Sequence, residues 1–204
     1  MVLAGGGTFG YHGAGFLRRR KLARLPILVA LAAAGFSGTA LADSIDINLN
    51  NDSIQATYAS YWGAADFSVG FVSNRDTHDW VASAGLLALG TRQAATRTEV
   101  AVGGKVYLVS VGSNDLRALG LGGAMRVFPG NGPIGIGGYA FYAPDVVTGG
   151  DGKNFWEAGA HVDFEVVKNT ADIYVGYRKL RAELNDGSHV TVDSGGHVGV
   201  RISF

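Results

Sequence analysis

The chain has 204 residues, enough for one domain, and its 47% hydrophobic content argues against a mostly disordered protein. All 17 acidic residues lie at or after Asp43, whereas five of the 17 basic residues precede it, so the part from residue 43 onward carries a net charge of −5. This balance offers no basic face for nucleic acid, and the absence of cysteine excludes disulfide scaffolds, thiol catalysis and cysteine-ligated zinc.

Residues 18–42 have the three-part layout of a secretory signal peptide. A basic cluster is followed by an apolar run from Leu25 to Phe36 and then by small residues that include Ala40 and Ala42, which predicts cleavage before Asp43. A transmembrane anchor is the alternative, but the run is shorter than the ~20 residues that span a bilayer and contains Pro26. We therefore expect residues 1–42 to be an N-terminal extension plus a cleaved signal peptide, exported by the Sec route.

From Ser44 onward the apolar residues alternate with a period of two, which predicts an all-β protein. Turn residues separate about ten segments: 44–50, 53–62, 66–73, 79–90, 98–111, 116–128, 134–143, 155–167, 171–184 and 189–204. Most reach the ~9–11 residues of a tilted transmembrane strand, whereas strands in soluble domains average about five or six. Residues 43–204 are therefore predicted to form a transmembrane antiparallel up-and-down β-barrel, with eight strands as the alternative count.

The last expected strand shows the alternation most clearly. Its apolar face holds Val190, Val192, Val198, Val200, Ile202 and Phe204. In a transmembrane barrel the apolar face meets lipid and the polar face lines the lumen, whereas a soluble barrel, which could bind an apolar ligand inside, reverses the two. A C-terminal aromatic preceded at alternate positions by Ile202, Val200 and Val198 is similar to the assembly signal of outer-membrane barrels, and it favours the membrane.

The polar faces of the last three strands supply the candidate functional residues. These are Glu157, His161, Asp163, Glu165, Lys179, Arg181, Glu183, Asp193, His197 and Arg201. Opposed charges on neighbouring strands predict a polar ladder that either fills a narrow lumen as a plug or lines a pore. An alternative is a lipid-modifying acyl hydrolase or transferase that uses His161 with Asp163 or Glu165, although no G-x-S-x-G motif accompanies them.

No metal site or cofactor is predicted. His161, Asp163 and Glu165 project from one strand about 6.5–7 Å apart, too far to close around one ion unaided. The 32 glycines have no collagen period and suit a narrow barrel with crowded walls. The longest expected connection, 144–154, is predicted to lie outside the cell, because periplasmic turns are short.

The start of the mature part, Asp43-Ser44-Ile45-Asp46-Ile47-Asn48-Leu49-Asn50, together with the glycine-rich strands and Phe204, resembles the YfaZ family of predicted outer-membrane proteins. The resemblance implies a barrel in the bacterial outer membrane and supplies no substrate or catalytic residue. Its expected partners are outer-membrane lipids and the secretion and barrel-assembly machinery, with no nucleic acid.

Overall fold

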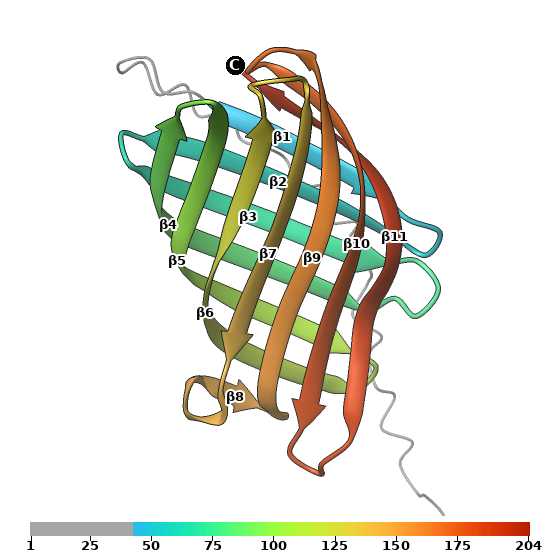
Figure 1. Ribbon diagram of the computed structural model, residues 1–204. Coiled ribbons are helices and arrows are strands. Elements are labelled where there is room, and N and C mark those ends of the chain that lie inside the picture. Colours follow the sequence, from blue (N-terminus) through green and yellow to red (C-terminus); the bar gives the residue numbers. More distant parts are fainter. Residues whose placement is uncertain (1–42) are drawn as a thin grey trace, which may run out of the picture. The chain divides into compact units, whose positions relative to one another are not determined.

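The computed structural model describes residues 43–204, which form a closed antiparallel β-barrel (Figure 1). Its wall consists of β1 (Asp43–Leu49), β2 (Ser53–Trp62), β3 (Ala65–Asn74), β4 (Trp80–Gln93), β5 (Thr96–Val111), β6 (Asn114–Pro129), β7 (Ile134–Ala143), β9 (Gly152–Val167), β10 (Ala171–Leu184) and β11 (His189–Ser203). The prediction of ten wall strands is confirmed. The eight-strand alternative is wrong, because β1 pairs with both β2 and β11 and thereby closes the barrel.

The connections define two ends of the barrel. The terminal end contains Asp43, Phe204 and the turns 63–64, 94–95, 130–133 and 168–170. The loop end contains the connections 50–52, 75–79, 112–113, 144–151 and 185–188. The longest of these holds a 3-10 turn, η1 (Asp145–Val147), and the short strand β8 (Thr148–Gly150), which pairs with β6. Within residues 43–204, no helix is long and apolar enough to cross a membrane.

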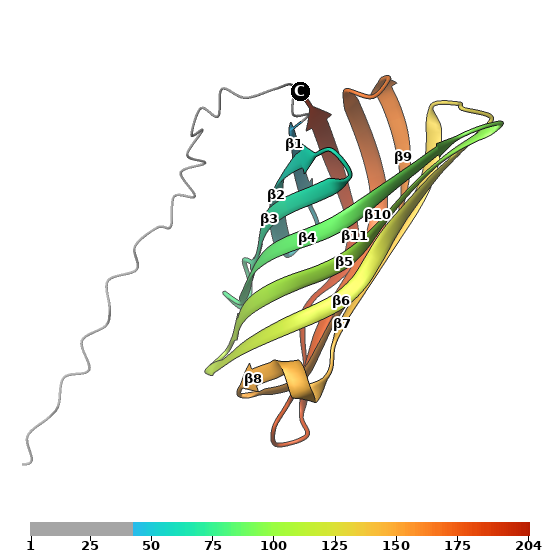
Figure 2. The same cartoon turned by 90° about the vertical axis from the view of Figure 1, so that its left-hand side faces the viewer.

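Strongly tilted strands shape the barrel. Strands β2–β6 cross the strands of the opposite wall, β9–β11, at a large angle in Figures 1 and 2. Closing a sheet of few strands requires such a tilt, and it brings side chains from opposite walls close to one another. The ends of the chain seal the closure, because the backbone amides of Asp43 and Phe204 each donate to the carbonyl oxygen of the other residue, at 2.8 and 2.9 Å.

The outer surface of the barrel carries a broad apolar band. Exposed members on successive strands include Ile47, Val69, Leu86, Val102, Val106, Leu121, Ile136, Val162, Val175 and Val200. A soluble protein would have to hold this continuous surface in water, whereas hydrocarbon solvates it without penalty. The band therefore faces lipid, and the alternative of a soluble barrel with an apolar interior is wrong.

The interior differs between the two ends. At the loop end, side chains from β3–β7 and β9–β11 pack into one apolar cluster, which we call the loop-end core. It consists of Val72, Val81, Leu87, Tyr107, Val109, Val111, Leu116, Ala118, Phe141, Ala143, Phe155, Leu180, Ala182, Leu184 and Val192. Toward the terminal end, the inward residues are mostly charged or polar. The interior thus changes from polar to apolar along the barrel.

A β-bulge in β11 corrects one expectation from the sequence. Leu180 pairs with Asp193 and Arg181 with Thr191, so β11 contains one extra residue at this point. Asp193 and Val192 are consequently both buried in the interior, and Val192 belongs to the loop-end core rather than to the lipid-facing row of Val198 and Val200. The strict alternation used in the sequence analysis fails there because a bulge shifts the side-chain parity by one residue.

Candidate functional site

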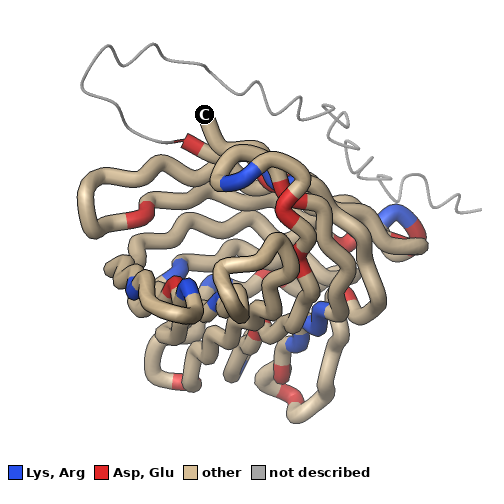
Figure 3. The backbone as a smooth tube through the Cα atoms, turned by 45° about the horizontal axis from the view of Figure 1, so that its top comes forward, with Lys and Arg blue, Asp and Glu red and all other residues tan. Residues whose placement is uncertain are grey.

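The polar lumen at the terminal end is the candidate functional site. Its first part, the arginine cluster, consists of Arg97, Arg126 and Arg201 with Asp46, Glu99, Asp163, Glu165 and Asp172. These residues come from β1, β5, β6, β9, β10 and β11, so the cluster ties opposite walls together. Figure 3, in which the terminal end comes forward, shows basic and acidic positions close together on these strands.

Each arginine of the cluster has a short contact with a carboxylate. An Arg97 guanidinium nitrogen lies 2.6 Å from Glu165, one of Arg126 lies 2.7 Å from Asp172, and one of Arg201 lies 3.0 Å from Asp46. Such charge-assisted bonds are about twice as strong as neutral ones. They compensate the desolvation of these buried charges.

Asp163 occupies the centre of the arginine cluster and has no exposed surface. Its carboxylate lies 3.5 Å from a nitrogen of Arg126, 3.5 Å from one of Arg201 and 3.3 Å from Nε2 of His161. None of these contacts meets the geometry of a hydrogen bond within the described residues. Asp163 is therefore held mainly by the electrostatic attraction of three surrounding groups.

A second group surrounds Arg178, which is 1% exposed. Its guanidinium donates to Asp193 and to Asn48, both at 2.7 Å, to Ser53 at 3.1 Å and to Gln55. We call Arg178 and these four partners the Arg178 group. The partners lie on β1, β2 and β11, so the group bridges the seam where the barrel closes.

A third group joins β5 to β9. Nζ of Lys105 lies 3.6 Å from Glu157, and the Tyr107 hydroxyl donates to the same carboxylate at 2.7 Å. The Lys105 ammonium also lies 4.3 Å from the ring centroid of Phe141, within cation–π range. The buried charge of Glu157 is thus satisfied within the wall of the lumen.

Tyr174 connects the arginine cluster to the Arg178 group. Its hydroxyl donates to Asp46 at 2.5 Å and accepts from Asn48 at 3.0 Å. The rings of His161 and His197 lie on either side, with centroids 5.6 and 5.8 Å from that of Tyr174.

Glycines leave room for the rings inside the lumen. A Cβ atom at Gly199 would lie 2.3 Å from Cζ of Tyr174, and one at Gly159 would lie 2.8 Å from the ring of Tyr139. Real Cβ contacts do not reach these distances, so a side chain at either position would displace the ring. Close approach of this kind gives a physical reason for part of the high glycine content.

A cavity of about 490 Å³ lies among these groups. Its lining extends from Ser203 and Asn169 at the terminal end to Leu87 and Phe141, which belong to the loop-end core. No cluster of three or more histidine, aspartate or glutamate residues suited to a metal ion occurs in the described part of the chain. The cavity is a vestibule of mixed charged and apolar lining that ends against the loop-end core.

Seven of the ten polar residues predicted from the sequence to face the lumen do so. They are Glu157, His161, Asp163, Glu165, Asp193, His197 and Arg201. The structure brings most of them into the arginine cluster or the groups beside it.

The inward placement of Lys179 and Arg181 is wrong, as is that of Glu183. From Arg178 onward the buried residues of β10 are Arg178, Leu180, Ala182 and Leu184, so the intervening positions face outward. The polar face was assumed to stay inside along the whole strand. Beyond Tyr177, however, the outer face leaves the apolar band and becomes polar, while the inner face joins the loop-end core.

Sequence reasoning missed Arg178, Arg97, Arg126 and Asp172 as residues of the lumen. A usable signal for two of them was present in β10, because Ile173, Val175 and Tyr177 form an apolar row that assigns Asp172 and Arg178 to the lumen. The pairing of Asp172 with Arg126 had no such signal, since it joins β10 and β6, which lie far apart in the sequence.

The four residues of the expected assembly signal lie on the outer face of the barrel. Val198, Val200, Ile202 and Phe204 face outward at the end of β11, and Phe204 is 65% exposed. Asp43, the expected first residue of the mature chain, begins β1. Ala40 and Ala42 lie outside the described residues.

The closed wall, the lipid-facing band and the charged lumen define a small outer-membrane β-barrel protein. The chain belongs to the YfaZ family, since the family described as YfaZ precursor matches residues 20–204. The resemblance noted in the sequence is thereby confirmed.

Two further comparisons accompany this assignment. No curated protein matches the chain in sequence. A solved structure similar to it is the outer membrane channel DcaP of Acinetobacter baumannii, with 13% sequence identity and a TM-score of 0.33 over 78% of this chain and 54% of the channel. The chain thus spans about half the length of that channel, and at this level of similarity the channel's activity is not transferred to it.

Proposed function

We propose that this protein is a closed, non-conducting barrel with a structural role in the outer membrane. The observation that carries the proposal is the loop-end core, in which side chains of β5 and β6 pack with those of β9 and β10 across the interior. The ring centroids of Tyr107 and Phe155 lie 4.7 Å apart within it. A packed apolar layer excludes water, and ions do not pass through a dry constriction.

The charged groups then fill the lumen and hold its strands together. All five inward cations, Arg97, Lys105, Arg126, Arg178 and Arg201, form ion pairs among the described residues. Most of these pairs join strands that are distant in sequence. The ladder consequently fixes the cross-section of the barrel, whereas a conducting path would need charges free to exchange their partners with permeating ions.

A pore is the alternative function. The vestibule at the terminal end would form its entrance, but its lining ends at the loop-end core. Conduction would require this core to separate, which exposes Phe155 and Leu180 to water. The packing of the core therefore favours the closed barrel.

A lipid-modifying enzyme is less well supported than the closed barrel or the pore. His161 does face Asp163, with Nε2 3.3 Å from the carboxylate, but both lie inside the barrel wall. A Cβ atom at Gly137 would lie 2.3 Å from that same Nε2, so the β7 backbone covers the ring. An acyl chain in the bilayer has no approach to this imidazole, and we do not propose the activity.

We also propose that the terminal end faces the periplasm and that export removes residues 1–42. Short turns at the terminal end and the longest connection at the loop end support this orientation, because outer-membrane barrels have short periplasmic turns. The outward row that ends at Phe204 supports recognition by the barrel-assembly machinery.

The first test is planar-bilayer recording on refolded residues 43–204. We expect no discrete conductance steps above those of a protein-free bilayer, because the loop-end core is dry. Insertion is verified by the protein's different gel mobility before and after boiling in detergent. Reproducible steps whose selectivity changes on Asp163→Asn or Arg201→Gln substitution would establish the pore and contradict the closed barrel.

The second test is deletion of Phe204. We expect the amount of folded protein in the outer membrane to fall several-fold, since the deletion removes the last residue of the outward row and its two backbone hydrogen bonds to Asp43. Quantitative immunoblotting of membrane fractions measures this. The control is Phe164→Ala, which removes an exposed aromatic side chain from the lipid-facing surface of β9. The amount of protein in the outer membrane should then stay near the wild-type level. Equal levels after deletion of Phe204 would remove the targeting role.

A further inference from the structure

The outer face of β10 changes character at one position. From the terminal end its outward residues are Ile173, Val175 and Tyr177, which belong to the apolar band, followed by Lys179 and Arg181. Trp156 on β9 lies directly beside them, as the cross-strand partner of Arg181. Aromatic residues followed by basic ones mark the boundary between the hydrocarbon and the headgroups.

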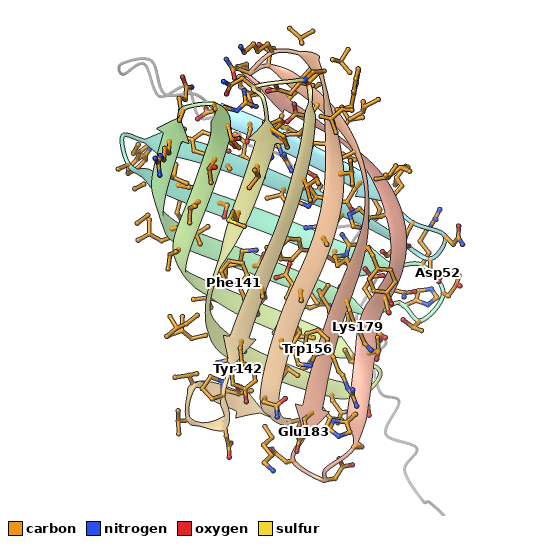
Figure 4. All side chains as sticks on the ribbon, viewed as in Figure 1. Asp52, Phe141, Tyr142, Trp156, Lys179 and Glu183 are labelled. Atoms are coloured by element: carbon orange, nitrogen blue, oxygen red, sulfur yellow. The ribbon has the colours of Figure 1, made fainter. Side chains whose placement is uncertain are left out.

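Lys179 and Arg181 have no ion-pair partner among residues 43–204, in contrast to the five cations inside the lumen. The Lys179 ammonium lies 5.9 Å from the ring centroid of Trp156, which holds the amine against the wall. Figure 4 shows Lys179 and Trp156 on neighbouring strands of one wall, with Glu183 nearer the loop end. Two cations thus face the membrane boundary without a protein counter-charge.

The one nearby carboxylate on this face is already engaged. Glu183 lies 3.3 Å from Nζ of Lys153 and accepts a hydrogen bond from Asn154 at 2.6 Å. It therefore does not neutralise Lys179 or Arg181. The local excess of positive charge remains available to an anion from outside the protein.

We propose that Lys179, Arg181 and Trp156 form a binding site for the phosphate group of a membrane lipid, with the lipid's acyl chains lying on the apolar band below. The proposed orientation places this site at the outer leaflet, so the expected ligand is a phosphorylated glycolipid headgroup. An arginine guanidinium binds phosphate through paired hydrogen bonds, and a lysine ammonium adds a point charge. The apolar band beside Tyr177 supplies the second half of an amphiphile site.

The test is lipid binding by the folded barrel in detergent, followed by native mass spectrometry. The probe is a bisphosphorylated diglucosamine glycolipid, compared with the same lipid after removal of its phosphates and with inorganic phosphate alone. We expect the wild type to retain the phosphorylated lipid, and Lys179→Gln/Arg181→Gln to bind it about 30-fold more weakly, as the loss of two headgroup-level cations implies.

Three controls make the result decisive. Lys179→Arg/Arg181→Lys should retain binding, and Arg92→Gln/Lys168→Gln, which removes two cations near the terminal end, should bind like the wild type. The third control is the affinity of the wild type for the dephosphorylated lipid. It should be no higher than the affinity of the Gln variant for the phosphorylated lipid. Equal affinity of wild type and Gln variant would overturn the proposal, as would equal loss in the Arg92/Lys168 control or full competition by inorganic phosphate at the lipid's concentration.

The inference rests on the proposed orientation for the identity of the lipid but not on the closed lumen. Binding is measured on purified protein, whereas the closed lumen is tested by conductance. A barrel that conducts and also binds the lipid would refute only the proposed function. A silent barrel that does not distinguish the phosphorylated lipid would refute only the lipid site.

Discussion

Arg178→Met is expected to lower the free energy of unfolding of the barrel by about 3–5 kcal/mol, a range typical of breaking a buried ion pair. The substitution removes the 2.7 Å bond to Asp193 and the bonds to Asn48, Ser53 and Gln55. It leaves a buried carboxylate whose remaining side-chain partner is Asn50, at 2.9 Å. The strands β1 and β11 both lose their hydrogen bonds to Arg178, so the barrel should open first at the seam between them.

Urea titration of the refolded barrel in lipid vesicles, followed by tryptophan fluorescence, measures this effect. Arg92→Met is the matched control, because the Arg92 side chain is exposed on β4, and surface changes usually stay within ±0.5 kcal/mol. The double variant Arg178→Met/Asp193→Leu should recover part of the loss by removing the unpaired charge. Equal effects of Arg178→Met and Arg92→Met would contradict the inward placement of Arg178.

Opening the loop-end core is expected to convert a silent barrel into a conducting one. Phe155 and Leu180 have no exposed surface and contribute to the core from adjacent strands. In Phe155→Ser/Leu180→Ser the apolar layer loses its two largest fully buried side chains on β9 and β10, and water can enter from the vestibule. Planar-bilayer recording should then show steps that the wild type lacks.

The control for this experiment is Phe164→Ser/Val162→Ser, which makes a comparable change on the lipid-facing side of β9. It should remain silent because the lumen is unchanged. Both variants are first checked for the heat-dependent gel mobility of a folded barrel. A folded Phe155→Ser/Leu180→Ser protein that stays silent would show that the arginine cluster, rather than the loop-end core, closes the lumen.

Local sequence patterns were sufficient for the wall of this protein. Period-two alternation and turn residues predicted all ten strands, and the bounds of 53–62, 134–143 and 171–184 agree with β2, β7 and β10. The reason is physical, since each strand of a membrane barrel must place apolar residues toward lipid at every second position. The residues of each strand meet that requirement independently of the other strands, so the pattern can be recognised one segment at a time.

The lumen depended on information that no single strand contains. Arg126 pairs with Asp172, and Arg97 with Glu165, across long separations in sequence. Their meeting is set by the tilt and register of strands around a closed barrel, and a one-residue change in register would turn each side chain to the other face. The sequence indicated that charges line the lumen, but not which of them would pair.

The assignment of Lys179, Arg181 and Val192 failed for related reasons. On β10 the outer positions beyond the apolar band are polar, and a bulge in β11 shifts the side-chain parity of β11 itself. The sequence by itself determined an all-β membrane barrel and the lipid-facing row that ends at Phe204. Only the tertiary structure decided which apolar side chains of opposite walls meet across the interior, because that packing depends on the tilt and register of distant strands, and the proposed closure of the lumen rests on it.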